Sequence, residues 1–130
     1  MENVRIRDYL DAIERKDAEA LGGMLTADVE HHEHPNRFTP AGAVHDRQAM
    51  LAGLARGAAL LAEEHYEVRD TLTVGERVAC RMQWRATTAI PMGGHPAGLA
   101  LQAALAVFFT FRDGRIARIE TYDCVAPFGA

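Results

Sequence analysis

The sequence predicts an α+β fold, in which helices cover one face of a curved antiparallel sheet and the sheet folds around an internal pocket. Apolar residues recur at helical spacing up to about residue 61 and then alternate with polar residues to the end of the chain. Helices that precede a run of strands, instead of alternating with them, are typical of this class. The 130 residues fit a single domain, 1–130, which is long enough to bury a core.

Three helices are predicted from apolar stripes and from acidic residues that can accept a hydrogen bond at a helix start. The first stripe, within residues 3 to about 16, consists of Ile6, Tyr9, Leu10 and Ile13. Asp17 is placed to cap a short second helix, and Asp46 to cap a third. The inward side of the third helix is expected to carry Met50, Leu51, Leu54, Ala58 and Leu61.

A strand is predicted between the second and third helices, where residues 28–35 read Asp-Val-Glu-His-His-Glu-His-Pro. Side chains of a strand alternate between its two faces, so Val29, His31 and Glu33 share one face. The apolar Val29 marks this face as the inner one, where burial tunes pKa values toward acid and base chemistry. Pro35 ends the strand, and residues 36–44 are expected to form a loop.

Four longer strands are predicted in the second half of the chain. One face of the first is expected to carry Tyr66, Val68, Asp70, Leu72 and Val74. Turns are predicted at Gly75-Glu76 and at Asp113-Gly114, the latter a strong hairpin signal. The inner faces of the next two strands are expected to carry Val78, Cys80, Met82 and Trp84, and then Leu105, Val107, Phe109 and Phe111.

Composition and charge argue against several classes of protein. The net charge of −4 and the absence of a Lys/Arg-rich run argue against a nucleic-acid or anionic-membrane partner. Apolar runs are too short to span a membrane and the chain starts without a secretion-signal pattern, so a cytoplasmic location is expected. Cys80 and Cys124 are then expected to be free thiols. Without a P-loop or dinucleotide-binding motif, no cofactor is expected.

The histidines of the first strand also suggest a metal site, because His32 and His34 lie two residues apart on one face. Such a site needs at least a third protein ligand, and no distal cluster in the sequence supplies one. We therefore expect no metal. His45 and His95 fall in predicted loops and are expected to be solvated.

Short motifs in a fixed order give the chain a family resemblance. They are Tyr9-x-x-Ala-Ile ahead of Asp17, Asp28-Val29, Asp46-Arg47, the run from Phe108 through Asp113-Gly114 to Ile116, and Tyr122-Asp123-Cys124. Over nearly its whole length the chain resembles the nuclear transport factor two-like superfamily and, within it, the SnoaL-like polyketide cyclases and ketosteroid isomerases. The resemblance implies a cone-shaped sheet wrapped around helices. It also implies a homodimer built on the outer sheet face, where Arg81, Gln83 and Arg85 should lie.

The likeness to ketosteroid isomerases implies roles for residues of the first helix and first strand. In those enzymes a helix-one tyrosine binds the substrate oxygen, a role that falls on Tyr9 here. The carboxylate that moves the proton falls on Glu33, or on His34 if Pro35 sets the alignment. The second oxygen donor of those enzymes falls near Val107, which cannot donate a hydrogen bond.

The likeness to SnoaL-like cyclases implies a role for the last strand. Those proteins use an aspartate there as acid and base, which corresponds to Asp123, or to Cys124 if the register differs. Asp123 on the inner face would open on the same pocket as Glu33. A structural alternative for Glu33 is an ion pair with Arg81 or Arg85.

The preferred hypothesis is a cofactor-independent enzyme that moves a proton on a small apolar carbonyl compound. Glu33 or His31 would be the base, Asp123 its acid-base partner, and Tyr9 would orient an oxygen. The predicted ligand-binding walls are Trp84, Phe109, Met50, Leu54, Val107 and Met82, which would suit a filled core equally well. The alternative hypothesis is a non-catalytic small-molecule binding or assembly domain of the same fold.

Overall fold

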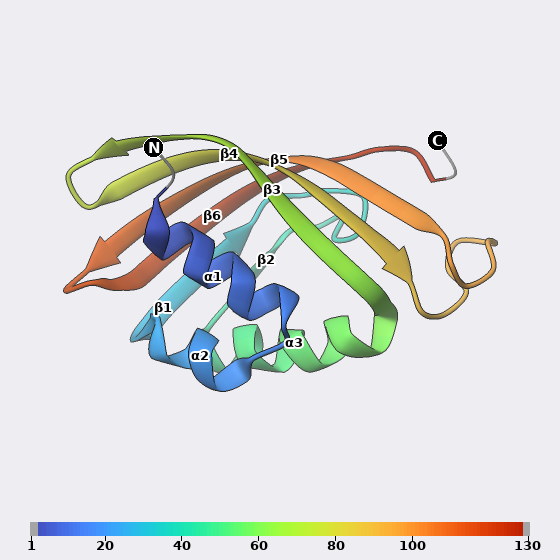
Figure 1. Cartoon of the computed structure of the whole chain (residues 1–130), viewed down its shortest axis with the longest axis horizontal. Coiled ribbons are helices and arrows are strands. Elements are labelled where there is room, and N and C mark those ends of the chain that lie inside the picture. Colours follow the sequence, from blue (N-terminus) through green and yellow to red (C-terminus); the bar gives the residue numbers. More distant parts are fainter. Residues whose placement is uncertain (1–2, 129–130) are drawn as a thin grey trace.

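Three helices lie against one face of a curved six-stranded sheet in the computed structural model, which describes residues 3–128 (Figure 1). The helices are α1 (Val4–Glu14), α2 (Ala18–Gly23) and α3 (Arg47–Leu60). Figure 1 shows them as a lower layer beneath the sheet, whose strands curve over them. The predicted α+β class is confirmed.

Each helix begins at a side chain that accepts hydrogen bonds from the backbone of its first turn. Asn3 caps α1, Asp17 caps α2 and Asp46 caps α3, so both predicted aspartate caps are confirmed. Loss of such a cap typically costs about 1 kcal/mol. Helix α3 ends at Leu60 and the next strand begins at Leu61, so no loop separates them.

The strands follow the order β2-β1-β6-β5-β4-β3 across the sheet. Their bounds are β1 Leu25–Glu33, β2 Ala43–His45, β3 Leu61–Val74, β4 Arg77–Thr88, β5 Ala100–Arg112 and β6 Arg115–Val125. Strands β1 and β6 run parallel, whereas the other neighbouring pairs are antiparallel. The predicted curved antiparallel sheet is thus confirmed except for the parallel pairing of β1 with β6, which the sequence pattern did not reveal because the hairpin with β5 fixes the direction of β6 independently of β1.

Strand β2 was not expected from the sequence pattern. It pairs with the second half of β1 and places His45 opposite His31. The predicted loop over residues 36–44 is therefore wrong at its end, because a strand of three residues is too short to show an alternation. Strand β1 also begins at Leu25, earlier than predicted.

A bulge after Val68 reverses the alternation of side chains in β3. Tyr66 and Val68 pack against the core. Beyond the bulge the pattern changes face, so Leu72 is 72% exposed and Val74 is 80% exposed. The prediction that Asp70, Leu72 and Val74 share the face of Tyr66 is therefore wrong.

The core fills much of the space between α1 and the sheet. Its buried members include Ile6 and Leu10 of α1, Val29 of β1, Val78, Cys80 and Met82 of β4, Val107, Phe109 and Phe111 of β5, and Ile116 and Ile119 of β6. These residues confirm the inner faces predicted for β4 and β5.

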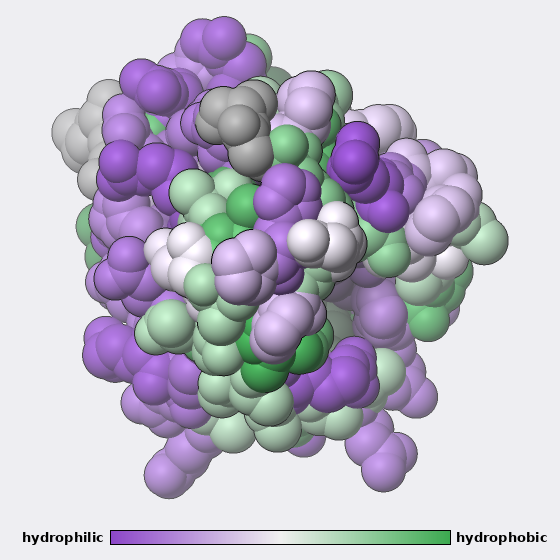
Figure 2. All heavy atoms as spheres, turned by 90° about the vertical axis from the view of Figure 1, so that its right-hand side faces the viewer, coloured by the Kyte–Doolittle hydropathy of each residue, from purple (hydrophilic) through white to green (hydrophobic). Residues whose placement is uncertain are grey.

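Apolar side chains also gather at one end of the molecule. Figure 2 shows the right-hand side of Figure 1, with hydrophobic side chains over its lower half, where α3 ends, and hydrophilic ones around them. Leu60, the last residue of α3, is 39% exposed. No helix within residues 3–128 is long and apolar enough to cross a membrane.

Replacing Ile6 by alanine should lower the free energy of unfolding by about 2–5 kcal/mol, because the side chain is buried and its loss leaves a cavity. Urea denaturation followed by circular dichroism measures this change. Val4→Ala is the matched control on the same helix, since Val4 is 70% exposed, and it should change stability by less than about 0.5 kcal/mol. Equal losses in the two variants would contradict this account of the core.

Candidate active site

A cavity with three adjoining lobes lies between the helices and the sheet. The helix lobe, beside α3, has a volume of about 390 Å³. The sheet lobe, between α1 and the strands, has a volume of about 220 Å³. The indole lobe, beside Trp84, has a volume of about 160 Å³. Tyr66 lines all three, so its side chain stands where the lobes meet.

The sheet lobe brings together the four residues predicted to be catalytic. They are Tyr9 from α1, His31 and Glu33 from β1, and Asp123 from β6. The parallel pairing of β1 with β6 sets Glu33 opposite Thr121, two residues before Asp123 on the same strand face. Cys124 is exposed, so Asp123 rather than Cys124 points inward.

The six residues predicted to form the pocket walls all line the cavity. Met50 and Leu54 line the helix lobe, Met82, Val107 and Phe109 the sheet lobe, and Trp84 the indole lobe. Leu54, Met82, Val107 and Phe109 are also buried members of the core, so they both fill it and border open space. Their contact with a ligand stays a prediction.

Two glycines of α3 widen the helix lobe. A methyl group at Gly53 would meet only Arg56, at 3.6 Å, and one at Gly57 would meet only Lys16, at 3.7 Å. Both neighbours are ends of flexible side chains. Packing of α3 therefore does not require glycine at either position, although glycine in a helix interior costs about 1 kcal/mol relative to alanine. The two glycines instead leave open space in the helix lobe.

Asp123 carries an orphaned oxygen in the sheet lobe. Its Oδ1 is buried and has no hydrogen-bond partner among the described residues. Burial, together with the negative charge of Glu33, raises the pKa of Asp123 to about 6. A buried polar atom without a partner is unusual in a folded protein and is often found where a ligand or a proton is handled.

Glu33 is held in one place by three side chains. Its Oε1 accepts hydrogen bonds from Asn36 at 3.3 Å and Thr39 at 3.0 Å, and its Oε2 lies 3.1 Å from His45 Nε2. Burial acts to raise the pKa of Glu33, but these hydrogen bonds outweigh it, so the pKa lies below the ordinary value. Glu33 is therefore an ionised carboxylate over the neutral range.

The ion pair considered from the sequence for Glu33 does not form. Arg81 pairs with Asp70 through two hydrogen bonds of 2.9 and 3.0 Å on the outer sheet face. Arg85 shares that face and is exposed. The strand alternation places both guanidinium groups on the sheet face that points away from the cavity. The hydrogen-bond partners of Glu33 come instead from the segment that follows β1.

His31 is held across the β1–β6 pair. Its Nε2 lies 3.2 Å from Thr121 Oγ1, and its ring centre lies 5.6 Å from that of His45. Burial lowers the pKa of His31 to about 4, even though the Glu33 carboxylate favours the charged ring. The imidazole is therefore neutral near neutral pH.

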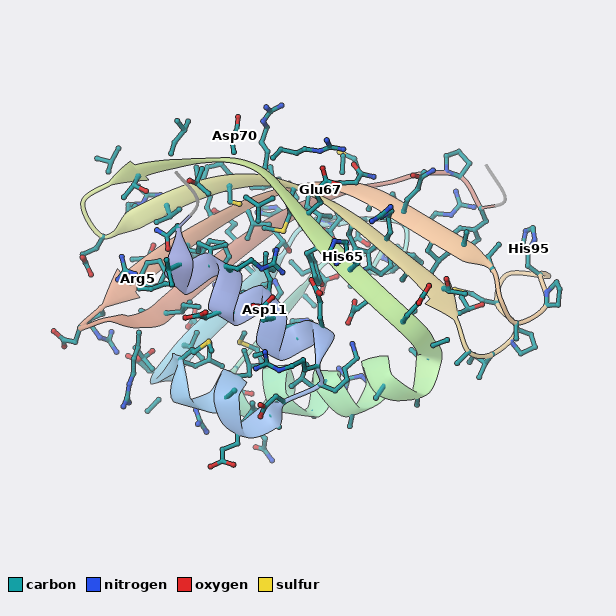
Figure 3. The ribbon with its side chains drawn as sticks, in the orientation of Figure 1. Arg5, Asp11, His65, Glu67, Asp70 and His95 are labelled. Atoms are coloured by element: carbon teal, nitrogen blue, oxygen red, sulfur yellow. The ribbon has the colours of Figure 1, made fainter. Side chains whose placement is uncertain are left out.

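His45 is a site residue that the sequence analysis missed. It lies on β2, is half-buried, and contacts Glu33, so the prediction of a solvated loop histidine is wrong. Only the pairing of β2 with β1 reveals this position. His95 does lie in the connection between β4 and β5, and Figure 3 shows it at the outer tip of that loop, away from the helices.

Tyr9 faces the cavity from α1. Its ring packs edge-on against Phe109, with the ring centres 5.5 Å apart. Burial, followed by the charge of Glu64, raises the pKa of Tyr9 well above its usual value, so the phenol keeps its proton. Its hydroxyl has no hydrogen-bond partner among the residues that the structure describes.

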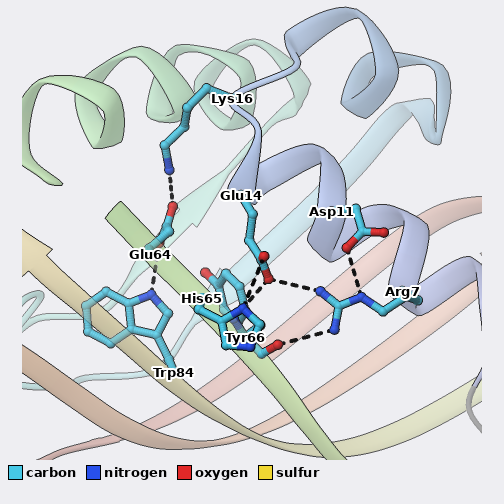
Figure 4. A network of polar contacts seen from close by, with 8 residues as sticks. All are labelled: Arg7, Asp11, Glu14, Lys16, Glu64, His65, Tyr66 and Trp84. Carbon is cyan, nitrogen blue, oxygen red and sulfur yellow. Dashed lines mark hydrogen bonds and ion pairs between the residues drawn. The ribbon is translucent and has the colours of Figure 1, made fainter. Parts of the chain in front are cut away.

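A second buried carboxylate, Glu64, was also missed by the sequence analysis. Its side chain is 7% exposed, pairs with Lys16, and accepts a hydrogen bond of 2.8 Å from the indole nitrogen of Trp84 (Figure 4). In the sequence it reads as an ordinary charged residue beside Glu63. Trp84 thus holds Glu64 as well as lining the cavity.

His32 of β1 and His34, the residue that follows the strand, lie on its other face. His32 contacts Glu30 at 2.7 Å, and His34 contacts Glu120 at 3.0 Å and stacks on Tyr122. Within residues 3–128 no group of three or more His, Cys, Asp or Glu side chains is arranged to hold a metal ion.

A comparison of the sequence with protein-family models places the chain in a known group. The model of the SnoaL-like domain matches residues 6–119, which run from α1 into β6. The chain belongs to the SnoaL-like family. The family prediction is therefore confirmed. No curated protein sequence matches this SnoaL-like chain.

Solved structures of similar fold carry different descriptions. Wild-type IdmH of Streptomyces antibioticus, a proposed polyketide cyclase, is 26% identical, with a TM-score of 0.78 over 92% of this SnoaL-like chain and 89% of that chain. A hypothetical protein of Catenulispora acidiphila with a ketosteroid isomerase-like fold, bound to trimethylamine, is 17% identical, with a TM-score of 0.75 over 94% and 86%. An LEH-like epoxide hydrolase of M. tuberculosis is 14% identical, with a TM-score of 0.73 over 92% and 80%.

The raised pKa of Asp123 predicts a pH-dependent stability difference. Ionisation of Asp123 is less favourable in the folded state than in the unfolded state. The protonated carboxyl group therefore favours folding below the ordinary aspartate pKa, and this contribution is lost as the pH rises through about 6. Asp123→Asn cannot ionise. Relative to the wild type, its free energy of unfolding should rise by about 1–2 kcal/mol between about pH 4 and about pH 7.5, allowing for partial exposure.

Urea denaturation of both proteins at the two pH values measures this difference. Cys124→Ser, at the exposed neighbouring position, is the control and should differ from the wild type by the same amount at both. A difference between Asp123→Asn and the wild type that stays constant with pH would mean that Asp123 ionises normally in the folded protein.

Proposed function

We propose that this SnoaL-like protein catalyses a cofactor-independent proton transfer on a small, apolar carbonyl compound, as an isomerase or cyclase does. The observation that carries the proposal is the Asp123 carboxyl group, which lines the sheet lobe while one of its oxygens is buried without a protein partner in the described residues. A positioned acid or base of this kind contributes on the order of 10²–10⁴ in rate.

Asp123 acts first as the base. With a pKa of about 6 it is mostly ionised at neutral pH, yet it binds a proton more strongly than an ordinary aspartate. It removes a proton from the carbon next to the substrate carbonyl, and the electron pair of that bond moves onto the carbonyl oxygen. Tyr9 stabilises the resulting enolate by donating a hydrogen bond to the oxygen.

Asp123 then acts as the acid. In an isomerisation it returns the proton to a different carbon of the same enolate. In an aldol-type ring closure the enolate carbon attacks a second carbonyl of the substrate, and Asp123 delivers its proton to the new alkoxide. In both cases the proton taken in the first step is given back in the second, so no external reagent is required.

Glu33 and His31 support the proton transfer by Asp123 without acting as the base. The hydrogen bonds to Glu33 lower its pKa and make it a weak base, while its charge helps to raise the pKa of Asp123. The neutral imidazole of His31 contacts Thr121 and provides a polar group on this wall of the lobe. The likeness to IdmH, at 26% identity, supports the cyclase form of the chemistry.

We further propose that the protein is a cytoplasmic homodimer built on its outer sheet face. Phe108 and Tyr122 lie there, 39% and 41% exposed, with ring centres 5.9 Å apart. Aromatic side chains are enriched at the centres of such interfaces. The charge of Arg81 is already paired with Asp70, which eases its burial.

Proton transfer can be measured without knowing the natural substrate. In deuterium oxide, the wild type should accelerate exchange of the acidic ring protons of β-tetralone, followed by NMR. The rate should rise with pH through about 6 and then level off, because the ionised form of Asp123 is the base. Asp123→Asn should slow the catalysed exchange by about 10²-fold or more.

Cys124→Ser is the control and should exchange at the wild-type rate, because Cys124 is exposed outside the cavity. An unchanged rate in Asp123→Asn would remove Asp123 as the base. Binding of the ketone by the wild type without any exchange would favour the non-catalytic binding domain instead.

The dimer is tested by sedimentation at micromolar concentration. Wild type should sediment as a dimer and Phe108→Asp as a monomer, because the substitution places a charge in the apolar centre of the proposed interface. Val4→Asp, at an exposed apolar position of α1 on the helix side of the sheet, is the control and should remain a dimer. A monomeric wild type would contradict the proposed assembly.

A further inference from the structure

We infer that Tyr66 is a second oxygen-binding residue of this site, whose hydroxyl and that of Tyr9 together hold the carbonyl oxygen of the ligand. The inference rests on the proposed function, because it assigns the oxygen partner of the same ligand. It also narrows the ligand class to neutral carbonyl compounds.

The hydroxyls of Tyr9 and Tyr66 are both available to a ligand. Neither makes a hydrogen bond with another protein group among the described residues. Among the described residues, every fully buried side-chain oxygen or nitrogen has a hydrogen-bond partner except Asp123 Oδ1. The two phenol oxygens have no partner and are absent from that class, so they are not fully buried. They are therefore open to the cavity. Both residues line the helix lobe and the sheet lobe. The protein thus holds two donors that face shared open space.

The backbone of Tyr66 is fixed by side chains of α1. Strand β3 lies at the edge of the sheet, where Tyr66 N–H and C=O face away from β4. The N–H donates to Glu14 Oε2 at 2.9 Å, and the carbonyl accepts from Arg7 Nη1 at 3.2 Å. Arg7 also donates to Glu14 at 2.9 Å and to Asp11 at 2.9 Å, which closes the network in Figure 4.

The two hydrogen bonds to the Tyr66 backbone also orient its side chain. They fix the position of this residue on the edge strand, and the alternation of the strand then directs the ring into the cavity. Tyr9 comes from the same helix as Arg7 and Glu14. One rigid element therefore sets the positions of both phenols, as a preorganised donor pair requires.

The surrounding charges favour a neutral ligand. Burial, followed by the charges of nearby groups led by Glu64, raises the pKa of Tyr66 well above its usual value, so the phenol remains a donor. The cavity also contains the carboxylates of Glu33 and Asp123. A ligand that enters as an anion would be repelled by them, whereas a ketone enters neutral and gains charge on its oxygen only during reaction.

Tyr66 also occupies a chemical role that this chain otherwise leaves empty. The family resemblance places a second oxygen donor near Val107, and Val107 is a buried apolar residue of the sheet lobe. Tyr66 reaches the same lobe from β3. Removal of one such donor typically slows an enzyme by about 10²–10³-fold.

The experiment uses β-tetralone labelled with a heavy isotope at its carbonyl carbon, bound to the full-length protein. Isotope-edited infrared spectroscopy records the carbonyl stretch, which moves to lower wavenumber with each hydrogen bond to the oxygen. Tyr66→Phe and Tyr9→Phe should each move the band part of the way back, and the double variant should move it farther. Tyr66→Phe should also slow proton exchange by about 10²-fold.

Tyr122→Phe is the matched control, because it removes the same hydroxyl from an exposed tyrosine on the outer face. It should leave the band and the exchange rate unchanged. A band in Tyr66→Phe identical to that of the wild type would overturn the inference. The absence of any complex at millimolar ketone would overturn it as well.

The infrared band separates this inference from the proposed function. Asp123→Asn removes the base but keeps both phenols, so the band should stay displaced while exchange stops. If exchange proves independent of Asp123 and the band still depends on Tyr66, the proposed chemistry fails and the oxygen-binding role of Tyr66 stands.

Discussion

The hydrogen bonds that hold the Glu33 carboxylate are the interaction on which the rest of the site depends. A partly buried charge without partners would cost several kcal/mol, and His45, Thr39 and Asn36 supply the donors that make it tolerable. All three follow β1 in the chain, so satisfying this carboxylate also folds residues 36–45 over one end of the cavity. Its fixed charge in turn helps to keep the neighbouring Asp123 protonated to a higher pH. Two carboxyl groups with separated pKa values are the usual basis for distinct acid-base roles.

Much of the fold was predictable because each long strand buries one face, and burial imposes an alternation that can be read locally. The inner faces of β4 and β5 and the two aspartate caps follow from this rule. The errors concern features that depend on distant partners. The bulge after Val68, the short strand β2 and the parallel pairing of β1 with β6 are all decided by contacts between segments far apart in sequence.

The residues of the site likewise include some that local sequence patterns predict and others that depend on tertiary contacts. Alternation was sufficient to place His31 and Glu33 on an inward face, and helical spacing was sufficient for Tyr9, whereas the choice of Asp123 over Cys124 needed the register of β6. His45 and Glu64 were not predictable, because each is buried only through partners brought in by tertiary structure. Glu64 becomes a buried ion only when Lys16 and Trp84 reach it from α1–α2 and β4. For Tyr66, alternation predicted a face shared with Val68, but an unpaired hydroxyl is a property of the whole cavity.

The glycines of α3 bear on how proteins with this architecture can diverge. Gly53 and Gly57 border the helix lobe with no side chain of their own, and the atoms that a methyl group would meet there belong to flexible Arg56 and Lys16. A relative with alanine or serine at these points would keep the same backbone and a firmer helix, yet accept a smaller guest. Ligand size can thus change on one wall while the groups that handle protons stay untouched on the other.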